Sequence, residues 1–144
     1  MNITLAKSRK IISVALKKAQ GIGLTKPMSV VVLDGRGTVK ASESQDGSST
    51  LRFKIALGKA NGCIALGIGS RAIFARANEQ PYFVQAVNAQ ADGNLVPVPG
   101  GVLVRDRKGA IIGAVGITGD TSDNDELCAV AGIEAAGFQA DTGA

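Results

Sequence analysis

Apolar and polar residues follow two different periods along this chain, and the periods predict helices and strands in a definite order. Apolar residues recur at the spacing of an amphipathic helix in five segments: residues 7–20 (preceded by Thr4), 49–67, 70–77, 81–91 and 123–136. Shorter apolar runs rich in β-branched residues predict strands over residues 28–33, 38–43, 95–98, 102–105 and 110–117. We expect residues 141–144 to be frayed.

Turn sequences join four of these strands in pairs. Asp34-Gly35 separates the first two strands, and residues 106–109 separate the last two, which is the pattern of β-hairpins. Two hairpins with helices between them exclude a parallel βαβ sheet. The sequence therefore predicts an α/β fold of the α+β type: an antiparallel sheet of about five strands with flanking helices, in a single domain spanning residues 1–144.

The composition indicates a core of small aliphatic side chains. Apolar residues make up 45% of the chain but aromatic residues only 3%. Cys63 and Cys128 each lie in an apolar run and are expected to be buried free thiols. There is neither a signal-peptide pattern nor an apolar run long enough to cross a membrane, so we expect a cytoplasmic protein without a membrane partner.

Charge is distributed unevenly between the two halves of the chain. Residues 1–72 carry twelve basic and three acidic residues, whereas residues 73–144 carry four basic and nine acidic residues. No nucleic-acid motif or interleaved aromatic residues accompany the basic residues, so a nucleic-acid partner is not predicted. Subunits that meet basic surface to acidic surface would explain the same asymmetry.

The absence of histidine restricts the chemistry. With no histidine in the chain, Ser-His-Asp and Cys-His nucleophiles are excluded. The two distant cysteines do not have the spacing of a zinc site, so no metal site is predicted.

Several motifs, taken together, resemble the GlcG/HbpS-like family, which includes the C-terminal domain of PduO-type corrinoid adenosyltransferases. They are the hairpin VVVLDGRGTVKA (residues 30–41), Lys59-Ala60, the turn at residues 99–102, the segment IGAVGITG (residues 112–119), Asp125-Glu126 and Ala131-Gly132. The resemblance covers nearly the whole chain and implies a profilin-like or PAS-like fold, homo-oligomers, and in some relatives haem binding or degradation. This chain departs from the family pattern at Asp120, where a small residue is common.

The absence of histidine also restricts how this chain could bind haem. Haem ligation by histidine is excluded here, and four other residues remain as candidate iron ligands: Cys63, Cys128, Met28 and Tyr82. No other cofactor is expected.

Two groups of residues are candidates for binding a ligand. Arg52 and Lys59 are seven residues apart, share one face of the second helix and are suited to hold a carboxylate; a solvated basic face is the alternative. Pro99, Gly100, Gly101 and Val102 form a turn whose bare backbone permits close approach of a ligand, or of another part of the chain. Ser48, Ser49 and Thr50 are expected to cap the second helix.

Asp125 and Glu126 are the candidate catalytic residues. They are adjacent, so they point to different sides of a helix, and one of them would act alone as a general acid or base. The alternative is structural: acids near the start of the last helix, Asp123 and Asp125, cap it and complement its dipole.

Three classes of function remain open from the sequence. The first is a small oligomeric ligand-binding or accessory protein of a catabolic pathway, with a small organic acid or a tetrapyrrole as ligand. The second is a cofactor-free isomerase, tautomerase or hydratase that uses Asp125 or Glu126. The third is a structural assembly protein. The sequence does not decide whether the chain is an enzyme.

Overall fold

Five helices and a five-stranded antiparallel sheet make up residues 2–144, the part of the chain that the computed structural model describes. In chain order the elements are α1 (Leu5–Gly21), β1 (Ser29–Asp34), β2 (Val39–Ser44), α2 (Thr50–Leu66), α3 (Ser70–Glu79), α4 (Pro81–Gln90), β3 (Gly101–Arg105), β4 (Ile111–Thr118), α5 (Ser122–Ala135) and β5 (Gln139–Asp141). The strand order is β2-β1-β4-β3-β5, and every neighbouring pair is antiparallel. The predicted fold class is confirmed.

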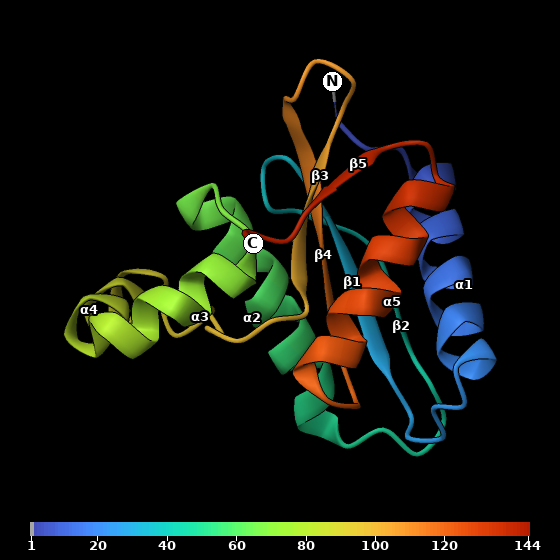
Figure 1. The fold of residues 1–144 in the computed structure, drawn as a ribbon, viewed down its shortest axis with the longest axis horizontal. Coiled ribbons are helices and arrows are strands. Elements are labelled where there is room, and N and C mark those ends of the chain that lie inside the picture. Colours follow the sequence, from blue (N-terminus) through green and yellow to red (C-terminus); the bar gives the residue numbers. More distant parts are fainter. Residues whose placement is uncertain (1) are drawn as a thin grey trace.

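Helices cover both faces of the sheet (Figure 1). α1 and α5 lie side by side on one face, α2 packs on the other, and α3 with α4 extends from α2 away from the sheet. Side chains of β1 alternate between the two faces: Val30 and Val32 belong to the core under α1 and α5, whereas Val31 and Leu33 belong to the core under α2. Burial on both faces explains why this strand is continuously apolar.

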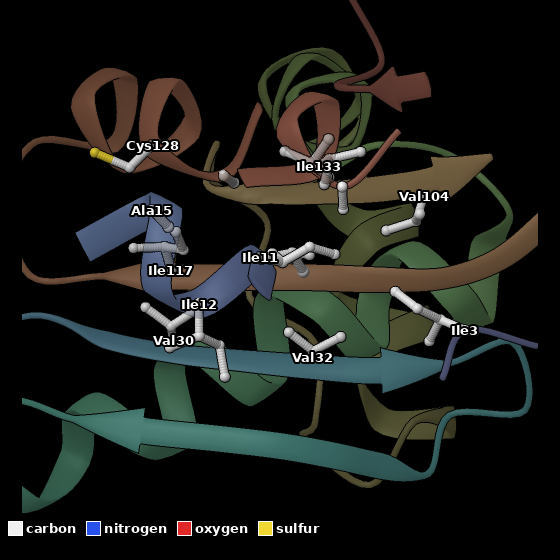
Figure 2. Packing of buried hydrophobic residues seen from close by; sticks show 14 of the residues in the cluster. Ile3, Ile11, Ile12, Ala15, Val30, Val32, Val104, Ile117, Cys128 and Ile133 are labelled. Atoms are coloured by element: carbon white, nitrogen blue, oxygen red, sulfur yellow. The ribbon is translucent and has the colours of Figure 1, made fainter. Parts of the chain in front are cut away.

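The larger core lies between the sheet and the α1–α5 pair (Figure 2). Ile11, Ile12 and Ala15 of α1 and Cys128 and Ile133 of α5 point toward the valines and isoleucines of the sheet. Both cysteines are buried free thiols, as predicted. The α2 face is thinner, because Ala56, Ala60 and Cys63 allow the helix to approach the strands closely.

The identity of one strand was predicted wrongly. Residues 95–98 are not a strand: Leu95 is buried beside α2, Val96 N donates to Gly58 O, and Pro97 and Pro99 have no N–H to offer a sheet. The fifth strand is instead β5, which pairs with β3. Residues at the C-terminus that were expected to fray are held as well, since Arg71 N donates to Thr142 O.

The helix starts also differ from expectation. Thr121 rather than an aspartate caps α5, accepting a hydrogen bond from Asn124 N. Ser49 occupies the cap position of α2, but no side chain accepts a hydrogen bond from that helix start. Between residues 2 and 144 no helix is long and apolar enough to cross a membrane.

Candidate functional site

A buried ion pair joins Lys59, a candidate ligand-binding residue, to Asp125, a candidate catalytic residue. Lys59 Nζ of α2 lies 3.2 Å from Asp125 Oδ2 of α5, and the side chains are 2% and 1% exposed. The same Nζ donates to Ile117 O at 2.9 Å, and Asp125 Oδ1 accepts from Asp120 N at 3.0 Å. The pair therefore connects α2, the end of β4 and the start of α5. Lys59 is not part of a solvated basic face, and Asp125 does not cap its own helix.

Burial shifts the pKa values of Lys59 and Asp125 in the direction that favours the uncharged form of each group. Desolvation raises the pKa of Asp125 above its ordinary value, although Lys59 and the Asp120 amide act in the opposite direction. Desolvation likewise lowers the pKa of Lys59, against the attraction of Asp125. A carboxyl group with a raised pKa suits acid–base chemistry, but both oxygens of Asp125 are already engaged by the protein.

The turn at residues 99–102 packs directly against Lys59. A Cβ at Gly100 would lie 2.7 Å from Lys59 Nζ, and one at Gly101 would lie 2.4 Å from Lys59 O. Gly100, where φ is +120°, and Gly101 are both buried, as is Val102. At Gly101 the nearest atom belongs to α2, and at Gly100 the Lys59 side chain and Ile117 O of β4 are equally near, so the glycines keep the turn in contact with both elements.

Arg52 is the predicted cation that reaches a cleft. Its Nη1 donates to Thr118 Oγ1 at 3.0 Å, one residue beyond the carbonyl that Lys59 holds, so the two cations share a face of α2 as predicted. The adjoining cleft has a volume of about 240 Å³. Its lining contains two cations and no acid: Lys26, Pro27, Gly47, Ser48, Ser49, Arg52 and Gly119.

The start of α2 adds to the positive potential of this cleft. The first turn of α2 contains no acidic residue, and no side chain caps its amide groups. Ser48 Oγ is buried and has no hydrogen-bond partner within residues 2–144. We call this cleft, with Lys26 on one side and Ser48, Ser49 and Arg52 at the start of α2 on the other, the Arg52 cleft.

Glu126 points to a different place from Asp125, as adjacent helical residues should. Arg71 Nε lies 3.0 Å from Glu126 Oε2, and the Arg71 guanidinium also pairs with Asp123. Beside this triad Pro99 lines a separate cleft of about 290 Å³, together with Arg71, Phe74 and the α5 start. Most of the predicted residues are buried: Lys59, Pro99, Gly100, Gly101, Val102 and Asp125. Of these, Pro99 also lines a cleft, and Arg52 is half-buried and lines another.

Several residues at this centre were missed in the sequence. Thr118 orients Arg52, Ser70 Oγ bonds both to Gly101 N and to Gly101 O, and Arg71 holds Glu126. All three make contacts across more than thirty positions of sequence. No local pattern marks these contacts; the family motif over residues 112–119 includes Thr118 but does not indicate its hydrogen bond with Arg52.

The candidate haem ligands do not converge on one place. Met28, Cys63 and Cys128 are fully buried in the cores, whereas Tyr82 is 68% exposed on α4. Desolvation raises the thiol pKa of Cys63 to about 12 and that of Cys128 to about 11, so both sulfurs stay protonated near neutral pH. Among residues 2–144 there is no cluster of three or more Cys, Asp or Glu side chains that could hold a metal ion.

Comparison with known proteins gives structural matches over nearly the whole chain. The crystal structure of a PduOC–heme complex superposes with a TM-score of 0.84 at 21% sequence identity, covering 96% of this chain and 97% of the other. Klebsiella pneumoniae protein ORFY gives a TM-score of 0.82 at 25% identity, covering 93% and 90%. A double mutant of HbpS from Streptomyces reticuli gives 0.78 at 24% identity, covering 94% and 87%.

No curated protein matches the chain. The family model described as haem degrading protein HbpS-like matches residues 3–134, which include the Lys59–Asp125 pair, the 99–102 turn and Arg52. The chain therefore belongs to the HbpS-like family, in agreement with the motifs in its sequence.

Proposed function

We propose that this protein is a small ligand-binding protein that holds a small organic acid in the Arg52 cleft. Membership of the HbpS-like family supports a ligand-binding role. The observation that carries the proposal is the Arg52 guanidinium, held by Thr118 at the mouth of a cleft whose lining has two cations and no acid. A carboxylate can take paired hydrogen bonds from the guanidinium, which is the strongest common contact for such a group.

The surroundings of Arg52 favour a small anion over a large one. The volume of about 240 Å³ accommodates a few carbon atoms and a carboxylate but not a tetrapyrrole. The uncapped start of α2 and Lys26 add positive potential on the same side. Asp120, next to Gly119, carries a carboxylate that Asn124 binds; this hydrogen bond holds the pKa of Asp120 below its usual range.

Haem is the second candidate, because the family is described as haem degrading and the similar PduOC structure is a complex with heme. The residues of this chain do not fit a haem whose iron is bound by a side chain. Histidine is absent, Met28, Cys63 and Cys128 are closed inside the cores, and Tyr82 stands alone on α4. We therefore assign no step to haem.

Catalysis by a carboxylate is the third candidate. Asp125 has a raised pKa, as an acid or base needs, but its side chain is 1% exposed and is paired with Lys59. Glu126 is paired with Arg71. A ligand in the Arg52 cleft would meet Arg52, Lys26 and the start of α2 first, which favours binding over proton transfer. Self-association into a homo-oligomer and a role beside a catabolic enzyme remain part of the proposal.

A thermal-shift screen of the purified protein tests the proposal. The panel contains small mono- and dicarboxylic acids, their amides as uncharged controls, haem and a corrinoid. A ligand present at about a hundred times its Kd adds about 2.7 kcal/mol to the free energy of unfolding and raises the Tm by roughly 5–10 °C. We expect a carboxylic acid to raise the Tm and its amide not to. A rise with haem alone would overturn the assignment.

A further inference from the structure

A further cavity, separate from the Arg52 cleft and from the cleft beside Pro99, is lined by residues of α2, α3 and α4. α3 and α4 are the two helices that extend from the body of the fold (Figure 1). The cavity has a volume of about 270 Å³ and opens between the end of α2 and the two following helices. All of its lining side chains but one are apolar: Leu66, Ile68, Ile73, Arg76, Phe83 and Val84.

The apolar part of the lining belongs to a small core of its own. Ile73, Val84 and Leu95 are its buried members, and Leu66 and Phe83 pack against them. Ile68 is 38% exposed at the edge of the cavity. A core of this size that is left open forgoes contacts that a ligand would supply.

Arg76 is the single charged group of the cavity, and its arrangement leaves it ready to bind an anion. Its guanidinium carbon lies 4.2 Å from the centroid of the Phe83 ring, and its Nε donates to Gln80 Oε1. Within residues 2–144 the two terminal amino groups donate no hydrogen bond and form no ion pair. The guanidinium is thus oriented by the ring while two parallel donors stay free.

We propose that this cavity binds a monocarboxylate with an aromatic or branched apolar body of about ten non-hydrogen atoms, larger than the benzene that fills a cavity of about 150 Å³. The apolar body would contact Ile73, Phe83 and Val84, and the carboxylate would pair with Arg76. The ligand class follows from the one cation in an otherwise apolar lining. The proposal is independent of the Arg52 cleft, because the two sites share no residue.

An NMR titration with trans-cinnamate tests this site in the full chain. With Ile, Leu and Val methyl groups labelled, we expect ring-current shifts at Leu66, Ile68, Ile73 and Val84. The methyl groups of Ile11 and Ile12, on the far side of the sheet, should not move. Absence of any methyl shift at millimolar cinnamate, or largest shifts outside the cavity, would overturn the proposal.

Variants and an uncharged analogue test the role of Arg76. We expect Arg76→Gln to weaken cinnamate binding about 10-fold or more, and cinnamyl alcohol to bind the native protein equally weakly. Arg36→Gln, a matched change in the turn between β1 and β2, should leave the affinity unchanged. Ile68→Trp, which places a larger side chain at the exposed edge, should abolish binding without disturbing the core. Equal affinity of the native protein for the acid and the alcohol, or unchanged affinity in both Arg76→Gln and Ile68→Trp, would contradict the assignment.

Discussion

At the scale of single residues, Lys59 and Asp125 lie in the interior of the protein, where an ionised group is destabilised because it is removed from water. Each is almost completely buried, and each bonds to the backbone near the end of β4 as well as to its partner. Removing a charged pair from water offsets much of its mutual attraction, so such a pair stabilises a protein little compared with apolar residues. Removing one partner, however, leaves the other charge buried alone.

The first prediction follows from that asymmetry. Asp125→Asn should lower the free energy of unfolding by about 3–5 kcal/mol, because Lys59 then lacks its counter-ion. Asp123→Asn is the matched control: its side chain is 81% exposed, and the change should be within about 0.5 kcal/mol. Urea denaturation measures both. A loss below about 1 kcal/mol in Asp125→Asn would show that the pair is not structurally important.

The second prediction concerns pH. The pKa of Asp125 is raised above 3.8, so the folded state binds more protons than the unfolded state just above that pH. The pKa of Lys59 is lowered below 10.5, so the unfolded state binds more protons just below that pH. Relative to a Lys59→Met/Asp125→Leu double variant, the free energy of unfolding should therefore fall as the pH rises from 3.8 and rise as the pH approaches 10.5. Equal pH profiles of the two proteins would contradict the pKa shifts.

At the scale of elements, α2 packs very close to the sheet because glycines of β3 and β4 have no side chains to separate them from the helix. A Cβ at Gly116 of β4 would lie 1.9 Å from Ala56 O, and one at Gly101 of β3 would lie 2.4 Å from Lys59 O. α2 therefore lies almost on the strand backbone, which places Arg52 and Lys59 over the end of β4.

The third prediction tests this seating. Gly116→Ala should lower the free energy of unfolding by about 3 kcal/mol, the upper range for an overpacked core, since α2 as a whole would have to move. Gly21→Ala, at the end of α1 with nothing near the added Cβ, should be neutral or stabilise by about 0.5–1 kcal/mol. Thermal denaturation of both variants gives the comparison. Equal free energies of unfolding for the two variants would show that α2 can move with little loss of stability.

The hydrophobic periodicity of the sequence correctly predicted most helices and strands. It failed for the elements that depend on contacts between residues far apart in the sequence. All five helices and the two hairpins were predicted, because their signals are local. β5 consists of three residues that become a strand only because β3 offers a free edge, and Leu95 is buried without joining the sheet. At the site, the shared face of Arg52 and Lys59 was predicted from their spacing. The hydrogen bond from Arg52 to Thr118 was not, because it depends on how α2 lies on β4.

At the scale of the whole molecule, the uneven charge of the two halves is used within the chain. Lys59 and Arg71 of the basic half pair with Asp123, Asp125 and Glu126 of the acidic half. These contacts hold α2 and α3 against the start of α5. Only two of the twelve basic residues in residues 1–72 take part in these pairs, so attraction between a basic and an acidic face of two subunits stays a prediction.

The fourth prediction concerns the proposed self-association. With several acids and bases already paired internally, contacts between copies would fall to exposed apolar residues such as Leu51 on α2 and Tyr82 on α4, which are 58% and 68% exposed. We expect the oligomer mass from light scattering to be the same at about 0.05 M and about 1 M salt, a range over which the Debye length falls to about 3 Å. Dissociation at high salt would favour charged subunit contacts, and a monomer at both would refute self-association.

The proposed role of Arg52 is to hold the carboxylate of a small organic acid. Isothermal titration calorimetry of the native protein, Arg52→Gln and Arg36→Gln, with the acid that raises the Tm most, tests it most directly. We expect Arg52→Gln to weaken binding about 10- to 100-fold, as loss of a charged hydrogen-bonding partner should, while Arg36→Gln binds as the native protein does. The same Kd in all three proteins would contradict it.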